Sequence, residues 1–304
     1  MRKIIVVAGP TAVGKTEYAI RIAEEFNGEI VSCDSMQLYK YMDIGSAKPT
    51  PEEQARVKHY LIDEIDPKDD FSVALYMEKA KAAIEHIFSM GKTPIIAGGT
   101  GLYLNSLLYE MDFGKSKGSE EYRDKLYKIA KEKGNEALHK ILQGISPDSA
   151  KRIHPNNVKR VVRAIEAIEI GENQLQDFSN VNVKTKDYDT MLICLNRNRE
   201  ELYDRINRRV DILINMGLLD EVKGLMKMGF TDADISMKGI GYKEIIGYFD
   251  GKYSLDEAIE LVKRNSRRYA KRQLTWFKKY QDMKWFNLSE SNIEDVLLWI
   301  KENK

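Results

Sequence analysis

A stretch near the N-terminus, GPTAVGKT, limits most strongly what this chain can fold into. It fits the phosphate-loop pattern of Gly, four residues, Gly-Lys and then Ser or Thr. Residues 3–8 before it are apolar and rich in β-branched side chains, which is typical of a buried strand, and residues 17–26 after it have the apolar spacing of a helix. A strand, a glycine-rich loop and a helix in this order predict a polyphosphate bound at the edge of an α/β sheet.

The chemistry of this loop follows from its residue types. Gly9 and Gly14 let the backbone turn so that N–H groups point inward, and the start of the helix adds a partial positive charge. Lys15 can reach a terminal phosphate, and the Thr16 hydroxyl is placed to hold Mg²⁺. The predicted phosphate-binding residues are Gly9, Pro10, Thr11, Ala12, Val13, Gly14, Lys15 and Thr16. A glycine-rich turn that fits the pattern by accident is the alternative.

Length and composition narrow the class of protein. The 304 residues allow one large domain or two, and 48 Lys and Arg against 47 Asp and Glu mean that any nucleic-acid surface must be local. Cys33 and Cys194 lie in apolar runs, which indicates buried thiols and not a disulfide framework. Since no apolar run approaches the roughly 20 residues that span a bilayer, and nothing resembles a signal peptide, we expect a cytoplasmic protein without a membrane partner.

Alternation of strands and helices continues to about residue 114 and then stops. The further strands predicted in this part are residues 29–33, 59–65 and 93–97, with a helix over residues 71–90. The next part shows helical spacing only, over residues 120–133, 135–142, 148–153 and 157–170. A strand returns at residues 190–195, and helices are predicted from there to the C-terminus, the last with a capping box of Ser291 and Glu294.

This order predicts an α/β fold, a P-loop NTPase-like parallel sheet flanked by helices, with an all-helical insert domain. The core is expected to comprise residues 1–114 and 186–304, and the insert residues 115–185. In such sheets ligands bind beyond the carboxyl ends of the strands, so we expect the site there.

Two further features follow predicted strands at that edge. Asp34 comes directly after residues 29–33, where a carboxylate can bind Mg²⁺ through water or act as a general base; a cap or turn residue is the alternative. Residues 98–101 (GGTG) stand where an NTPase often has its magnesium-binding acid, and no acid is present. Their glycines let a ligand approach the backbone and Thr100 offers a hydroxyl, although a tight strand-to-helix turn explains the same residues.

Residues 263–279 contain eight basic residues and no acidic one. At 100° per residue, seven of these cations fall within an arc of about 140°, and aromatic residues with Gln273 lie opposite. The pattern predicts a helix that docks one face on the core and offers Arg268, Arg272 and their neighbours to a polyanion; a solvated face paired with acids is the alternative. In the insert, Lys159, Arg160 and neighbouring cations form a second basic face.

Arg205, Arg208 and Arg209 follow the late strand. By analogy with nucleotide kinases, arginines at this place can close over phosphates, and a surface helix fits them equally well. The histidines and cysteines show neither metal-ligand spacing nor a nucleophile pair.

Taken together, these motifs resemble the bacterial tRNA dimethylallyltransferases, also called tRNA isopentenyltransferases. The matching segments, in family order, are GPTAVGKT at 9–16, DSMQLY at 34–39, DIGSAKP at 43–49, AGGTGLYL at 97–104, HPNNVKRVVRAIE at 154–166, IGYKE at 240–244 and RRYAKRQLTWF at 267–277. They span nearly the whole chain. Two places depart from the family pattern: Ser46 stands where Thr is common, and residues 171–179 match the usual Gly-rich turn only loosely.

The resemblance implies transfer of a dimethylallyl group from dimethylallyl pyrophosphate to N6 of adenosine 37 in tRNA, with release of pyrophosphate. It implies that the phosphate loop holds the pyrophosphate with Mg²⁺ at Thr16, that Asp34 is the general base, and that Thr100 is a catalytic position near the target nucleotide. Negative charge then develops on the departing pyrophosphate, where Lys15 and the loop N–H groups can stabilise it.

The partner that the resemblance implies is the anticodon stem-loop of tRNA, bound by a protein that we expect to be a monomer. The positions matched to tRNA contacts, together with two arginines of the basic helix, are Asp34, Ser35, Met36, Gln37, Thr100, Arg123, Val158, Lys159, Arg160, Val161, Val162, Arg268 and Arg272. Three other functions stay open: an adenine-nucleotide isopentenyltransferase, a P-loop small-molecule kinase that uses ATP, and a non-enzymatic RNA-binding protein.

Overall fold

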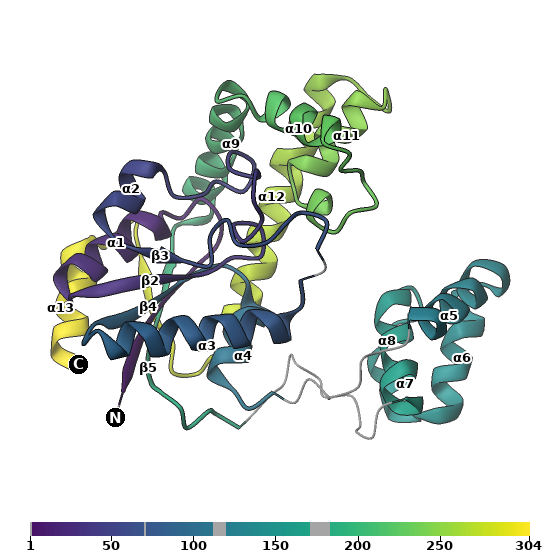
Figure 1. The fold of residues 1–304 in the computed structure, drawn as a ribbon, viewed down its shortest axis with the longest axis horizontal. Helices are drawn as coiled ribbons and strands as arrows, with labels where there is room; N and C mark the ends of the chain where they lie inside the picture. The colour runs from purple at the N-terminus through teal and green to yellow at the C-terminus, as the bar shows by residue number, and fades with distance from the viewer. Residues whose placement is uncertain (1, 70, 112–119, 171–182) are drawn as a thin grey trace. The chain divides into compact units, whose positions relative to one another are not determined.

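The computed structural model describes residues 2–69, 71–111, 120–170 and 183–304 (Figure 1). The chain forms two compact units, one of Met1–Tyr109 with Lys184–Lys304 and one of Glu110–Val183. These limits differ by a few residues from the boundaries that the sequence indicates. Among the described residues, no helix is long and apolar enough to cross a membrane.

The first unit is built on a six-stranded sheet in the order β3-β2-β4-β1-β5-β6. Its strands are β1 Lys3–Ala8, β2 Gly28–Cys33, β3 His59–Tyr60, β4 Thr93–Gly98, β5 Asp189–Asn196 and β6 Lys284–Asn287. All of these neighbours pair in parallel. Ala8 pairs with both Gly98 and Cys194, and Gly98 also pairs with Cys33, so four strands end at one edge.

Helices cover both faces of this sheet, because each central strand divides its apolar side chains between two cores. Ile4 and Val6 of β1 belong to one buried cluster, and Ile5 and Val7 belong to the other. The helices of this unit are α1 Lys15–Glu25, α2 Pro51–Arg56, α3 Val73–Ser89, α4 Gly101–Leu108, α9 Arg199–Asn215, α10 Leu218–Lys227, α11 Tyr242–Phe249, α12 Leu255–Phe277 and α13 Ile293–Asn303, with a short 3₁₀ helix at Ser236–Lys238.

The second unit is helical where it is described and has a core of its own. Its helices are α5 Glu120–Lys133, α6 Asn135–Ile145, α7 Pro147–Arg152 and α8 Val158–Glu169. Leu138, Leu142 and Ile165 are fully buried in a cluster made by these helices. The predicted fold class, a parallel α/β sheet with a helical insert, is confirmed.

Two local predictions about the C-terminal part are wrong. The stretch expected to be helical contains β6, a four-residue edge strand that is too short to show a period of its own. The last helix is capped one residue later than predicted, since the Asn292 side chain accepts from Asp295 N–H and Asp295 accepts from Asn292 N–H. Asn caps a helix as well as Ser does, so both pairs fit the sequence rule.

The region between β2 and α3 also differs from expectation. The strand predicted over residues 59–65 shrinks to the two residues of β3. Helix α2, which the sequence did not predict, begins at Pro51, and Thr50 caps it through a reciprocal pair with Glu53. Residues 171–179, the loosely matched turn of the insert, lie outside the described residues.

Candidate active site

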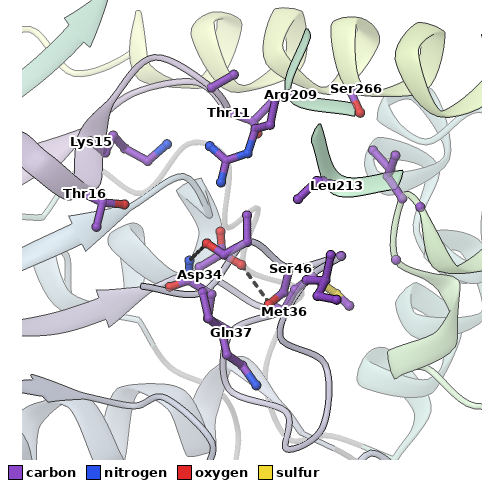
Figure 2. Close-up of a pocket in the computed structure, with 18 of the residues that line it drawn as sticks. Thr11, Lys15, Thr16, Asp34, Met36, Gln37, Ser46, Arg209, Leu213 and Ser266 are labelled. Atoms are coloured by element: carbon purple, nitrogen blue, oxygen red, sulfur yellow. Dashed lines mark hydrogen bonds between the residues drawn. The ribbon is translucent and has the colours of Figure 1, made fainter. Parts of the chain in front are cut away.

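A cavity of about 730 Å³ opens at the carboxyl ends of the strands (Figure 2). Its walls are the phosphate loop, residues 34–37 after β2, the loop of residues 43–50, helices α9 and α12, and the turn at residues 238–241. Since these segments come from both ends of the first unit, the cavity forms only when that unit is folded.

The phosphate loop ends in a helix start that is open to an anion. Gly14 lies at the N-cap of α1 with φ 111° and ψ 21°, a left-handed conformation that favours glycine, and no side chain caps the helix. The first N–H groups of α1 therefore keep their capacity to bind a phosphate oxygen. Arg205 Nε donates to the Ala12 carbonyl at 3.0 Å and Arg197 Nε donates to the Val13 carbonyl at 3.2 Å, which fixes the loop.

Lys15 lies in this loop beside the cavity, and its Nζ donates to the Pro10 carbonyl at 2.8 Å. The pKa of Lys15 is lowered to about 8. Burial is the main cause and nearby Arg209 contributes, while the negative charge of Asp34 opposes the change. Proton binding at Lys15 and anion binding in the loop should therefore strengthen each other.

We expect the affinity for inorganic pyrophosphate to fall by about tenfold between about pH 7 and pH 9 through Lys15 alone, because the free ammonium loses its proton near pH 8. Titration calorimetry at several pH values measures this fall. Lys15→Arg is the control, since its guanidinium stays charged. All other groups that titrate, including pyrophosphate itself, are the same in the two experiments. Parallel pH profiles for the two proteins would contradict the expectation.

Asp34 projects into the same cavity from the end of β2. Its Oδ1 accepts from the Met36 N–H at 2.9 Å, so the turn role that the sequence left open is present and occupies one carboxylate oxygen. Lys15 and Arg209 both interact electrostatically with this carboxylate. Figure 2 shows the two cationic side chains reaching into the space beside Asp34.

The structure separates the three arginines whose role the sequence left open. Arg209 lines the cavity, and desolvation lowers its pKa without removing its charge. Arg205, one helical turn earlier on the same face, supports the phosphate loop. Arg208 forms an exposed ion pair with Asp204. The phosphate-closing role therefore stays a prediction for Arg209 alone.

Thr100 does not line the cavity, although Gly98 does. Thr100 instead supports the cavity wall through its backbone and hydroxyl contacts. The Thr100 Oγ1 accepts from the Ser35 N–H at 3.1 Å, and the Thr100 N–H donates to the Cys33 carbonyl at 3.1 Å. Both contacts hold the segment that carries Asp34.

The three residues after Asp34 all line the cavity. Gln37 accepts from the Ser32 hydroxyl at 2.9 Å and donates to the Ala47 carbonyl at 3.3 Å. Met36 packs against Gly239, where an added Cβ would lie 2.5 Å from the Met36 Cε. Ser35 is held through its N–H by Thr100. These residues shape the wall that an acceptor would meet.

The loop of residues 43–50 is fixed by a carboxylate that sequence reasoning missed. Glu221 of α10 accepts from the N–H groups of Asp43, Ile44 and Gly45 at 2.8, 2.7 and 3.0 Å, and from the Tyr242 hydroxyl at 2.8 Å. Four donors on one carboxylate make a strong anchor for the loop. No local pattern signals this contact, because the partners lie far apart in sequence.

The predicted cationic face on α12 is present. Arg264, Arg268, Lys271 and Arg272 of α12 are exposed, and so are Lys278 and Lys279 in the turn after the helix. Arg267, which the helical wheel places among them, is partly buried and bonds to Asn207 of α9. Arg272 stacks over the ring of Tyr269, 5.5 Å from its centroid, and both residues line the cavity, so the cationic face reaches the site.

Within the insert, the predicted RNA contacts fall into three groups. Lys159 and Arg160 are exposed and Val158 is partly buried. Val161 and Val162 are fully buried in the insert core, so we correct their assignment from RNA contact to core packing. Arg123 donates from Nε to the buried carboxylate of Glu166 at 2.7 Å, which gives it a structural partner within the insert.

The fold and the cavity define a phosphate-loop α/β protein with a carboxylate and an arginine beside its anion site. Residues 37–280 match the family described as IPP transferase. The chain belongs to this family, which confirms the resemblance seen in its motifs.

Proteins of similar sequence match this chain along nearly its whole length. It is 52% identical to the tRNA dimethylallyltransferase of Alkaliphilus oremlandii, over 95% of this chain and 92% of that protein. It is 51% identical to the tRNA dimethylallyltransferase of Clostridioides difficile, over 100% of this chain and 99% of that protein.

Solved structures show the same likeness. A tRNA isopentenylpyrophosphate transferase from Bacillus halodurans is 42% identical with a TM-score of 0.74, and the match covers 99% of this chain and 95% of that one. A eukaryotic dimethylallyltransferase acting on tRNA is 30% identical with a TM-score of 0.82, over 95% of this chain and 75% of that one.

Proposed function

We propose that this chain transfers a dimethylallyl group from dimethylallyl pyrophosphate to N6 of adenosine 37 in tRNA and releases pyrophosphate. One observation carries the proposal within the family: a single cavity brings Asp34 together with Lys15 and Arg209 beside an uncapped helix start. The cations suit a departing pyrophosphate, and the carboxylate suits a proton leaving an amine.

On the donor side, the loop N–H groups, Lys15 and Arg209 bind the pyrophosphate. As the allylic C–O bond breaks, negative charge grows on the oxygen that leaves the carbon and spreads over the pyrophosphate, and these groups stabilise that charge. Since Arg205 and Arg197 hold the phosphate loop, its N–H groups need little reorganisation during the reaction.

On the acceptor side, Asp34 takes a proton from the adenine amine as the new C–N bond forms. An exocyclic amine of adenine is a poor nucleophile, so proton removal and orientation both matter. The target base has to leave its stack to enter the cavity. Residues 35–37 and Tyr269 line the cavity that receives it.

The site fits Mg²⁺ as a cofactor held together with the substrate. Thr16 and Asp34 offer oxygen atoms to the same cavity, and Mg²⁺ usually takes one or two protein oxygens plus phosphate oxygens and water. Among the described residues, no group of three or more His, Cys, Asp or Glu side chains gathers to hold a metal by itself. When bound, Mg²⁺ would neutralise charge on the pyrophosphate.

We propose a cytoplasmic protein that acts as a monomer. A tRNA substrate, which the names of the relatives indicate, supports the cytoplasmic location.

Radiolabelled dimethylallyl pyrophosphate, offered with tRNA, with AMP and with no acceptor, tests the function. Label in tRNA alone is the expected result. Equal transfer to AMP would instead identify an adenine-nucleotide transferase. ATP turnover without a prenyl donor would identify a kinase, and tRNA binding without any product would identify a binding protein.

We expect Arg268→Glu with Arg272→Glu to weaken tRNA binding by at least about tenfold and to lower the salt slope of log Kd by about two, because two phosphate contacts are lost. Filter binding at several salt concentrations measures both quantities. Lys223→Glu with Lys227→Glu is the matched control, since it reverses two exposed cations at the same spacing on α10. An unchanged slope in the α12 variant would refute the proposed surface.

A further inference from the structure

The side-chain amide of Gln273 bridges two loops of the site. It comes from α12 and is 5% exposed. Its Oε1 accepts from the Thr11 N–H of the phosphate loop at 2.9 Å, and its Nε2 donates to the Gly99 carbonyl at 3.0 Å. One buried group thus satisfies a donor of the phosphate loop and an acceptor in the turn after β4.

The fit around this amide admits one orientation. A flipped amide would place its NH₂ against the Thr11 N–H and its oxygen against the Gly99 carbonyl, and both contacts would be repulsive. A Cβ added at Gly99 would lie 2.2 Å from the Gln273 Nε2, so the glycine makes room for the bridge.

The bridge continues to the carboxylate of Asp34. Gly99 precedes Thr100, whose hydroxyl accepts from the Ser35 N–H. Ser35 follows Asp34 directly, and the Asp34 carboxylate is itself held by the next N–H. A short series of contacts therefore connects the donor loop to the proposed base through Gln273.

We propose that Gln273 is a positioning residue that sets the spacing between the donor pyrophosphate and the acceptor base. This inference rests on the proposed prenyl transfer, in which the breaking C–O bond and the attacking nitrogen must be aligned. A displacement of about 1 Å between such groups can slow a reaction by about a hundredfold. Because Gln273 lies on the buried side of α12, its effect is separate from that of the exposed cations on the same helix.

The test compares Gln273→Met, which keeps the length of the side chain and removes both hydrogen bonds, with Gln273→Glu, which keeps only the acceptor for Thr11. Asn265→Leu is the matched control: it removes another α12 amide, one that bonds to Glu244 Oε1 at 2.7 Å. The measurements are kcat, the KM values for donor and tRNA, the thermal midpoint, and hydrogen exchange of the Thr11 amide.

We expect Gln273→Met to lower kcat by about ten- to a hundredfold while the KM for tRNA stays within about threefold, and to speed exchange at Thr11. The kcat of Gln273→Glu should lie between those of Gln273→Met and the wild type. If Gln273→Met does not fold, the kcat of Gln273→Glu decides the question. Asn265→Leu should keep kcat within about threefold. A Gln273→Met protein with wild-type kcat, or one that loses tRNA affinity in place of kcat, overturns the inference.

The outcomes separate this inference from the proposed function. If the wild type transfers no prenyl group to tRNA, the proposed function fails. If the wild type is active and the Gln273 variants are equally active, only the positioning role fails. The exchange of the Thr11 amide reports the bridge whether or not the protein is active.

Discussion

Asp34→Asn is expected to slow prenyl transfer by about 10²–10⁴-fold while tRNA affinity changes little. Asn has nearly the same shape and keeps an oxygen for the Met36 N–H, so the turn after β2 should persist. It cannot accept a proton at neutral pH, which removes the proposed base. Single-turnover rates at saturating substrates and a separate measurement of tRNA binding check the two parts of this expectation.

Asp187→Asn is a suitable control, because that carboxylate forms a partly exposed ion pair with Lys81 and is absent from the cavity lining. Its rate should equal that of the wild type. If Asp34→Asn instead weakens tRNA binding and leaves the saturated rate unchanged, Asp34 positions RNA and another group removes the proton.

Arg209→Gln is expected to lower kcat by about 10²–10³-fold, in the range found when one donor to a developing anion is lost. The side chain lies in the cavity beside Asp34, and its charge faces the space that the phosphate loop also borders. Affinity for pyrophosphate, the product that carries the full charge, should fall together with kcat. Steady-state rates and pyrophosphate inhibition measure these effects.

The chain supplies a close control for this arginine. Arg208→Gln changes the adjacent residue, which is exposed and paired with Asp204, and should leave both quantities near their wild-type values. Arg209→Lys should recover part of the activity, because it keeps the charge and loses the planar donor geometry. Equal losses in the Arg208 and Arg209 variants would point to damage of α9 and not to a lost phosphate contact.

The sequence predicted the parts of the site that have local signals. The phosphate loop is a fixed pattern between a strand and a helix, and Asp34 was found because a strand end in such a sheet is a ligand position. The fold class followed from the alternation of strands and helices and from its interruption by the insert.

Other parts of the site depend on contacts that no local pattern reports. Gln273 and Thr11 are 262 residues apart, and the three N–H partners of Glu221 lie on a loop 176 to 178 residues before it. In the insert, the family resemblance suggested an RNA contact for Arg123, but a buried carboxylate 43 residues later is its partner within the insert. Only the folded chain distinguishes a cation that is exposed from one that is already paired.

The position of α12 near the end of the chain has a consequence for synthesis. Residues up to Tyr109 contain the phosphate loop, Asp34 and Thr100, but Arg209 and Gln273 follow the insert. During translation, the N-terminal segment emerges long before the groups that complete the cavity. A nascent chain should therefore gain the competence to bind pyrophosphate in one late step, when α12 leaves the ribosome and docks. Chains stalled before that helix should carry an intact loop motif and no working site.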